Sequence, residues 1–140
     1  RDFFMDLSSI ATDNVTEVLE LILTFTRFRE TILKRNTSRV NRPNFRPMDL
    51  DVETFTQHMS QAIDEHLKNG RLLLCDDDLF QFGAEGSFQC CPVVDYTALA
   101  VFKRSIREYI ALQMKKLSDN CMNRKIASEL LRRKRCQATS

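Results

Sequence analysis

Glycine and proline are confined to the middle of this chain. It contains three of each, and all six lie between residues 43 and 92. Proline breaks helices because it lacks an N–H and clashes with the preceding turn, and glycine weakens them through its entropy cost. The sequence therefore predicts two long helical segments on either side of a turn-rich middle.

Length and composition favour one small helical domain. The chain has 140 residues, of which 43% are apolar and 29% charged, a balance typical of globular proteins. So few glycines argue against an all-β fold with many tight turns. We expect residues 1–140 to form a single helical interaction domain. Its predicted fold is mainly α, a small bundle of three to four helices with a long C-terminal helix.

Two helices are predicted in the first 70 residues, one on each side of the first two prolines. Apolar residues spaced three and four apart indicate a helix over residues 12–36, with Asn14 and Glu17 at the spacing of a capping box. After a basic connector with two prolines, a second helix is expected over residues 49–69. Asp49 or Asp51 is its expected N-cap, and Gly70 is its expected stop.

Residues 71–92 are predicted to be a turn-rich insert. Two short runs of alternating character flank Gly83-Ala84-Glu85-Gly86 and are compatible with a short β-hairpin around residues 79–91 with a four-residue turn. An irregular apolar loop packed over the helices is the competing interpretation.

The C-terminal segment, residues 95–135, is predicted to be one long or bent helix with Asp95 as its cap. Unbent, it would be about 60 Å long, whereas a chain of this size has a radius of gyration of about 14 Å. Either it bends near Asn120 or its apolar strip is covered by oligomerisation. Where the two longest helices cross, we expect a nearly fully buried core of Ile22, Phe25, Phe102, Ile106 and Ile110.

Catalytic, metal and cofactor signatures are absent from the sequence. His58 and His66 are eight residues apart, too far for the four-residue spacing with which two imidazoles bind one zinc ion. The five cysteines form no Cys-x-x-Cys pair, and Asp76-Asp77-Asp78 lacks the other residues of a calcium loop. We therefore expect no enzyme activity, catalytic residue, metal or cofactor.

The cysteines also bear on localisation. An odd number of irregularly spaced cysteines does not form a disulfide framework, so we expect five thiols and an intracellular protein. No signal peptide or long apolar run is visible, and no membrane association is expected. Cytoplasm or nucleus is the predicted location, because Arg132–Arg135 resembles a nuclear-import patch; a solvated helix end explains the same charges.

Charge is distributed unevenly. Residues 43–102 hold three basic and ten acidic side chains, and residues 103–140 hold eleven basic and three acidic ones. A chain with this charge distribution can associate head to tail or offer two separate docking surfaces. Nucleic-acid or chromatin association through the basic helix ends is the alternative function, possible but not favoured.

The predicted function is protein–protein interaction in an adaptor or scaffold, by self-association or by binding a helical partner. The long C-terminal helix is expected to expose an apolar strip flanked by charge, which favours an antiparallel pairing or an acidic partner over a parallel zipper. Phe45, between two prolines, is either a partner anchor or packed on its own domain. The candidate partner-binding residues are Phe45, Met114, Leu117, Ile126, Leu130, Arg132, Arg133, Lys134 and Arg135.

Overall fold

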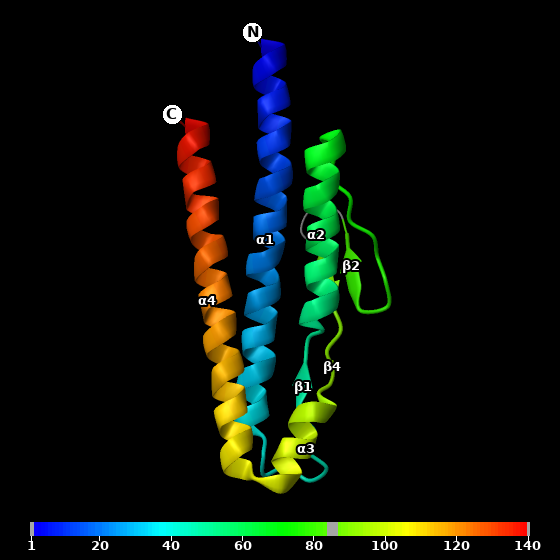
Figure 1. Ribbon diagram of the computed structural model, residues 1–140, viewed down its shortest axis with the longest axis vertical. Coiled ribbons are helices and arrows are strands. Elements are labelled where there is room, and N and C mark those ends of the chain that lie inside the picture. Colours follow the sequence, from blue (N-terminus) through cyan, green and yellow to red (C-terminus); the bar gives the residue numbers. More distant parts are fainter. Residues whose placement is uncertain (1, 84–86, 140) are drawn as a thin grey trace.

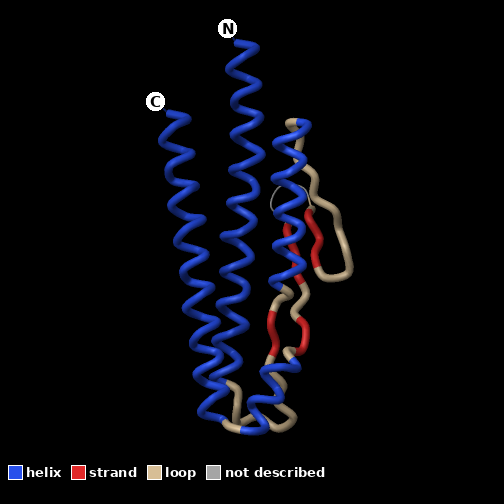
Figure 2. Tube along the Cα trace, in the orientation of Figure 1, coloured by secondary structure: helices blue, strands red, loops and turns tan. Residues whose placement is uncertain are grey.

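The computed structural model describes the backbone of residues 2–83 and 87–139, and the side chains of residues 14–83 and 87–137. The chain is mainly helical (Figures 1 and 2). Its elements in order are α1 (Asp2–Ser38), β1 (Met48–Asp49), α2 (Val52–Asn69), β2 (Phe80–Phe82), β3 (Phe88–Cys90), β4 (Val93–Val94), α3 (Tyr96–Arg104) and α4 (Ile106–Thr139).

The two long helices are α1 and α4, which lie side by side along most of the molecule, with α2 on the other side of α1 (Figure 1). Helix α1 begins ten residues before the predicted start, because no glycine or proline interrupts it there. Asn14 is therefore not a cap but an interior residue, and its side-chain amide donates to the Gly70 carbonyl at 3.2 Å.

The ends of α2 and α3 follow the predicted capping chemistry. The Asp51 side chain accepts from Thr54 N, so α2 begins at Val52 and not at Asp49. Gly70 closes α2 with φ +67°, a left-handed conformation that favours glycine. Asp95 caps α3 by accepting from Ala98 N.

The C-terminal segment breaks at Ser105 and not near Asn120, where a bend was one of the two predicted alternatives. Ser105 is extended (φ −156°, ψ 113°) and separates α3 from α4. Its hydroxyl accepts from Glu108 N at the start of α4, so it acts as an N-cap. Asn120 lies inside α4 and is buried. Its side-chain amide donates to the Thr26 carbonyl of α1 at 2.7 Å, which satisfies the buried polar group.

Two small antiparallel sheets complete the fold. Strands β2 and β3 pair as the predicted hairpin, with Phe80 opposite Cys90 and Phe82 opposite Phe88. The predicted four-residue turn includes residues 84–86, which lie outside the described residues. Strands β1 and β4 pair Met48 with Val94 and bring the connector after α1 beside the start of α3.

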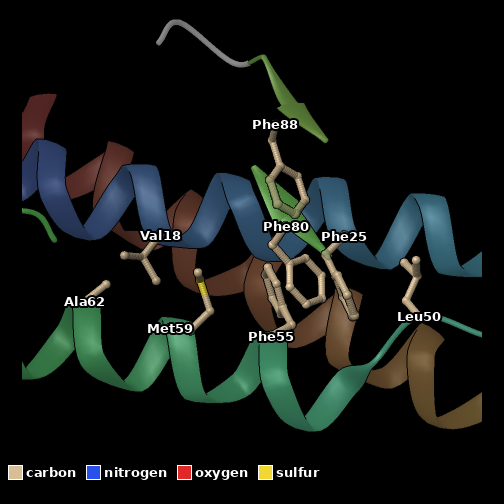
Figure 3. Packing of buried hydrophobic residues seen from close by; sticks show 8 residues of the cluster. All are labelled: Val18, Phe25, Leu50, Phe55, Met59, Ala62, Phe80 and Phe88. Carbon is tan, nitrogen blue, oxygen red and sulfur yellow. The ribbon is translucent and has the colours of Figure 1, made fainter. Parts of the chain in front are cut away.

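The main apolar core joins α1, α2 and the hairpin (Figure 3). The rings of Phe25 and Phe55 stack with centroids 3.9 Å apart, and Phe80 packs beside both. A second cluster of Leu19, Ala127 and Leu131 lies between α1 and α4. The hairpin thus supplies aromatic volume that the helices alone lack.

The predicted helix-crossing core is largely wrong. Phe25 is buried, but Ile22, Phe102 and Ile110 are half-buried and Ile106 is 57% exposed. The reason is that the face that α4 buries in this region contains polar groups, those of Tyr109, Gln113 and Asn120. Hydrogen bonds make this possible: Tyr109 Oη donates to the Asn36 carbonyl at 2.7 Å, and the Asn36 side chain donates to Gln113 Oε1 at 3.0 Å.

Phe55→Ala should lower the free energy of unfolding by about 3–5 kcal/mol, because it leaves a cavity between α1 and the hairpin. Urea unfolding followed by circular dichroism measures the change. Tyr96→Ala, which removes a ring that is 69% exposed, is the control and should shift stability by no more than about 0.5 kcal/mol. Equal losses in both variants would contradict this description of the core.

Candidate partner-binding groove

An apolar groove runs along α1 between α2 and α4. It consists of two adjoining hollows of about 320 and 630 Å³, which share Leu19, Ile22 and Leu130 in their walls. Along α1 the hollows extend from Asn14 to Arg29, about 22 Å at the helical rise of 1.5 Å per residue. Figure 1 shows the arrangement that produces it, with α2 and α4 on either side of α1.

The floor of the groove is the apolar stripe of α1. Val15, Val18, Leu19 and Ile22 recur at spacings of three and four, which places them on one face of the helix. Val18 and Leu19 are also buried in the two core clusters, so the floor is part of the packed interior and cannot readily collapse.

Both rims of the groove carry exposed apolar side chains. On α2 these are Ile63 and Leu67, with 45% and 75% of their surface exposed. On α4 they are Ile126 and Leu130, with 52% and 45% exposed. Each pair is spaced four residues apart and therefore lies on one side of its helix. Exposed apolar residues that converge on a single concavity are typical of a binding surface.

One end of the groove is polar and basic. Asn14, His66, Arg133 and Lys134 line it, and Asn14 Nδ2 lies 3.4 Å from His66 Nδ1. Arg133 pairs with Glu129 at 3.2 Å, while no acidic side chain among the described residues pairs with Lys134. This end therefore combines apolar surface with positive charge.

The structure divides the predicted α4 strip between two flanks. Ile126 and Leu130 line the groove, whereas Met114, which is 53% exposed, and the half-buried Leu117 do not. The predicted strip steps five residues from Cys121 to Ile126, which turns the helix about 140° beyond one full turn. Residues before and after that step therefore lie on different flanks of α4.

Phe45 lies away from the groove and packs on its own domain. Its ring meets Phe102 and Tyr109 edge to face, with centroids 5.3 and 6.2 Å away. Of the two interpretations weighed from the sequence, the structure favours the intramolecular one.

The predicted basic patch Arg132–Arg135 is partly neutralised by acidic neighbours. Arg132 and Arg133 both contact Glu129, and Arg135 contacts Glu20 of α1 at 3.1 Å. The hydrogen bond from Arg132 lowers the pKa of Glu129 to about 2. These pairs are exposed and contribute little stability, but they reduce the positive field of the patch.

Ile63 and Leu67 were not among the predicted partner-binding residues. A sequence signal for them exists, because Met59, Ile63 and Leu67 are spaced four apart along α2. It extends the buried stripe of Phe55, Met59 and Ala62 sideways. The apolar stripe of α2 is therefore too wide for one neighbouring helix to cover. Its uncovered side indicates a second contact surface.

The end of the groove at Arg29 borders a cluster of four charged side chains, of which two are buried (Arg29 and Asp49) and two are half-buried (Lys116 and Asp95). Arg29, which lines the groove, donates to both oxygens of Asp49 in β1 at 2.9 and 3.1 Å. Lys116 of α4 donates to Asp49 at 2.9 Å and to Asp95 before α3. Two cations and two carboxylates thus form a neutral charge cluster that joins α1, β1, α3 and α4.

The pKa values of the charge cluster follow from its pairing. Burial raises the pKa of Asp49, but hydrogen bonds and charges from Arg29 and Lys116 outweigh burial and hold it below its usual range. Burial lowers the pKa of Lys116, but the two carboxylates outweigh it and raise the pKa. Asp49 and Lys116 are therefore both charged near neutral pH.

The remaining chemistry-bearing residues do not converge. Within residues 2–83 and 87–139, no group of three or more His, Cys, Asp or Glu side chains is placed to hold a metal ion. No disulfide joins the five cysteines. His58 pairs with Asp77 at 2.6 Å and packs on Phe80 and Phe82, which fixes the insert on α2. Across the described part of the chain, none of the helices is apolar and long enough to cross a membrane.

Comparison with known proteins yields no relative. No protein-family model, no curated protein and no solved structure matches the chain. Functional inference therefore rests on the groove and its surroundings.

Asp49→Asn should lower the free energy of unfolding by about 3–5 kcal/mol near pH 7, because Arg29 and Lys116 then share too little negative charge. In the wild type, the Asp49 contribution is complete above the ordinary carboxyl pKa of about 3.9 and is lost as pH falls through the lower folded-state pKa. Urea unfolding at pH values from about 6 to 3 should therefore show a flatter profile in the variant.

Asp64→Asn, which removes an exposed carboxylate from α2, is the control for the Asp49 variant. It should leave the free energy of unfolding within about 0.5 kcal/mol of the wild-type value. Unchanged stability of Asp49→Asn would contradict the structural role of the charge cluster.

Proposed function

We propose that this chain is a non-enzymatic protein–protein interaction domain, of the adaptor or scaffold kind, that binds an amphipathic helix of a partner protein in the groove between α2 and α4. The supporting observation is the groove itself, whose packed apolar floor is flanked on both sides by exposed Ile and Leu side chains. Large apolar residues converging in this way favour protein contact over solvent exposure.

A helix suits the shape of the groove. It runs parallel to α1 for about 22 Å, which corresponds to about four helical turns. Helix-in-groove recognition places residues i, i+3 or i+4 and i+7 of the ligand into such a surface. A ligand helix lying over Ile22, with α2 and α4 beside it, would complete a four-helix arrangement.

The charges at the groove favour an acidic partner. Arg133 and Lys134 line its end, and the nearest acid on that part of α4, Glu129, already pairs with two arginines. A ligand helix with Asp or Glu at the matching end gains attraction and faster association. A second copy that presents its α4 would instead bring further Arg and Lys residues. We therefore favour another protein over self-association.

The proposed location is inside the cell. Cys75 and Cys91 are exposed thiols, which persist in a reducing compartment. The cytoplasm and the nucleus both meet this condition. Import through Arg132–Arg135 would require these residues to leave their contacts with Glu129 and Glu20.

Selection of displayed helical peptides against the immobilised chain tests the proposal. Selected peptides should carry Leu or Ile at i, i+3 or i+4 and i+7, together with acidic residues towards one end. Leu67→Glu and Ile126→Glu should each weaken their binding at least about tenfold, because each places a charge against apolar surface. Fluorescence anisotropy with a labelled peptide measures the change.

Met114→Glu is the matched control, because Met114 is as exposed as Ile126 but lies on the other flank of α4. It should leave peptide affinity within about twofold. Equal weakening by Met114→Glu and Ile126→Glu would exclude the groove as the binding site. A dimer of the chain alone that dissociates on Ile126→Glu would identify a second copy as the occupant, and salt-dependent retention on nucleic acid would favour the alternative function.

A further inference from the structure

A second concavity lies at the other end of the molecule from the polar end of the groove, where α1 passes into the connector before β1 (Figure 1). It encloses about 300 Å³. Four arginines line it: Arg35 and Arg39 from the last turn of α1 and its continuation, and Arg42 and Arg46 from the connector. We call this concavity the arginine pocket.

The four guanidinium groups lack compensating acids. Residues 31–48 contain no Asp or Glu. Within residues 14–83 and 87–137, no ion pair joins any of the four to a carboxylate. By contrast, the nearby Arg29, Lys34 and Arg124 are all paired. Uncompensated like charges around one concavity repel one another, and a bound anion would relieve that repulsion.

The backbone that carries these arginines is held in place. Asn36 pairs with both the N–H and the carbonyl of Met48, at 3.0 and 2.7 Å. Pro47 is fully buried, and its carbonyl accepts from Asp95 N at 2.9 Å. Phe45 is fixed by its edge-to-face contacts with Phe102 and Tyr109. The pocket is therefore pre-organised, which reduces the entropy cost of binding.

The tight turn in the connector depends on one further residue. Asn44 has φ +57°, a left-handed conformation that asparagine tolerates better than most residues. It reverses the chain between Arg42 and Arg46, so that both arginines reach the same concavity.

We propose that the arginine pocket binds a compact ligand carrying two or more phosphate groups. Guanidinium groups contact phosphate oxygens in bidentate fashion. Four of them around a pocket of about 300 Å³ suit a small ligand that carries several negative charges. In an extended acidic peptide, single charges are separated by about 3.3 Å per residue. Such a peptide therefore matches the density of positive charge in the pocket less well.

Nucleic acid fits the pocket less well than a compact polyphosphate. Binding of single strands combines a basic track with aromatic rings on which bases stack. Phe45 is the aromatic residue of the lining, and its ring already packs against Phe102 and Tyr109. The pocket thus has phosphate-binding groups without a stacking surface.

The ligand chemistry has two sources, a soluble polyphosphate and the headgroup of a phosphorylated lipid. Inositol hexakisphosphate and pyrophosphate, titrated by calorimetry, probe the first. Co-sedimentation with phosphatidylcholine vesicles, with and without phosphatidylinositol bisphosphate, probes the second. Binding in either arm supports the pocket, and the arm that responds at lower ligand concentration identifies the source.

The test variant is Arg39→Gln combined with Arg42→Gln, and the control is Arg27→Gln combined with Arg107→Gln. Both pairs remove two positive charges, but Arg27 and Arg107 are exposed and lie outside the pocket. The test variant should bind inositol hexakisphosphate at least about tenfold more weakly, and the control should stay within about twofold. Thermal unfolding by circular dichroism checks that both variants fold like the wild type.

Three results would overturn the proposal. The first is wild-type protein that binds neither inositol hexakisphosphate nor bisphosphate vesicles. The second is equal weakening by the test and control variants, which would show attraction by net charge alone. The third is single-stranded RNA that binds more tightly than inositol hexakisphosphate and loses binding in the test variant, which would assign the pocket to nucleic acid.

Discussion

A cluster of four charged side chains, two buried and two half-buried, connects α1, β1 and α4 with the start of α3. Asp49 lies in a two-residue strand, yet it accepts hydrogen bonds from Arg29 of α1 and Lys116 of α4. Through Lys116 it is linked to Asp95, which caps α3. A charge removed from water is tolerated only when it is paired, so these groups constrain one another's positions. The place of α4 beside α1, and with it one wall of the groove, therefore depends on a strand far away in sequence.

Local chemistry made part of this fold predictable from the sequence. The hairpin, the left-handed Gly70 and the caps Asp51 and Asp95 each depend on residues within a few positions. Glycine and proline content likewise placed the long helices, since it limits where a helix can end. Such signals act before tertiary structure forms, and so one sequence suffices to recognise them.

The face that α4 buries could not be predicted in the same way. Hydrophobic periodicity selected Ile106 and Ile110, whereas the buried residues of α4 include the polar Gln113 and Asn120. Their partners, Asn36 and the carbonyl of Thr26, become neighbours only after the chain has folded back. Asn120, near which a bend was one predicted alternative, is in fact a contact with α1. The groove could not be predicted from the sequence for the same reason, because its two rims come from helices that are distant in sequence.

Helix α1 supports both proposed sites. Towards its N-terminal side, Val15 to Ile22 provide an apolar floor, and at its C-terminal end Arg35 and Arg39 provide charge. The apolar stripe therefore lies before the segment without acidic residues, which begins at residue 31. Helix α1 carries the stripe and the start of that segment. Occupation of one site leaves the surface of the other accessible.

The polar contact between α1 and α4 has a kinetic consequence. Its hydrogen bonds join residues 73, 77 and 94 positions apart, so a long loop must close before any of them forms. The stacked rings of Phe25 and Phe55 require a much shorter closure. We therefore expect α1, α2 and the hairpin to collapse first, and α4 to dock afterwards as directional bonds select its register. Slower native-state hydrogen exchange in α4 than in α2 would contradict this order, because the last part to dock is expected to be the first to open.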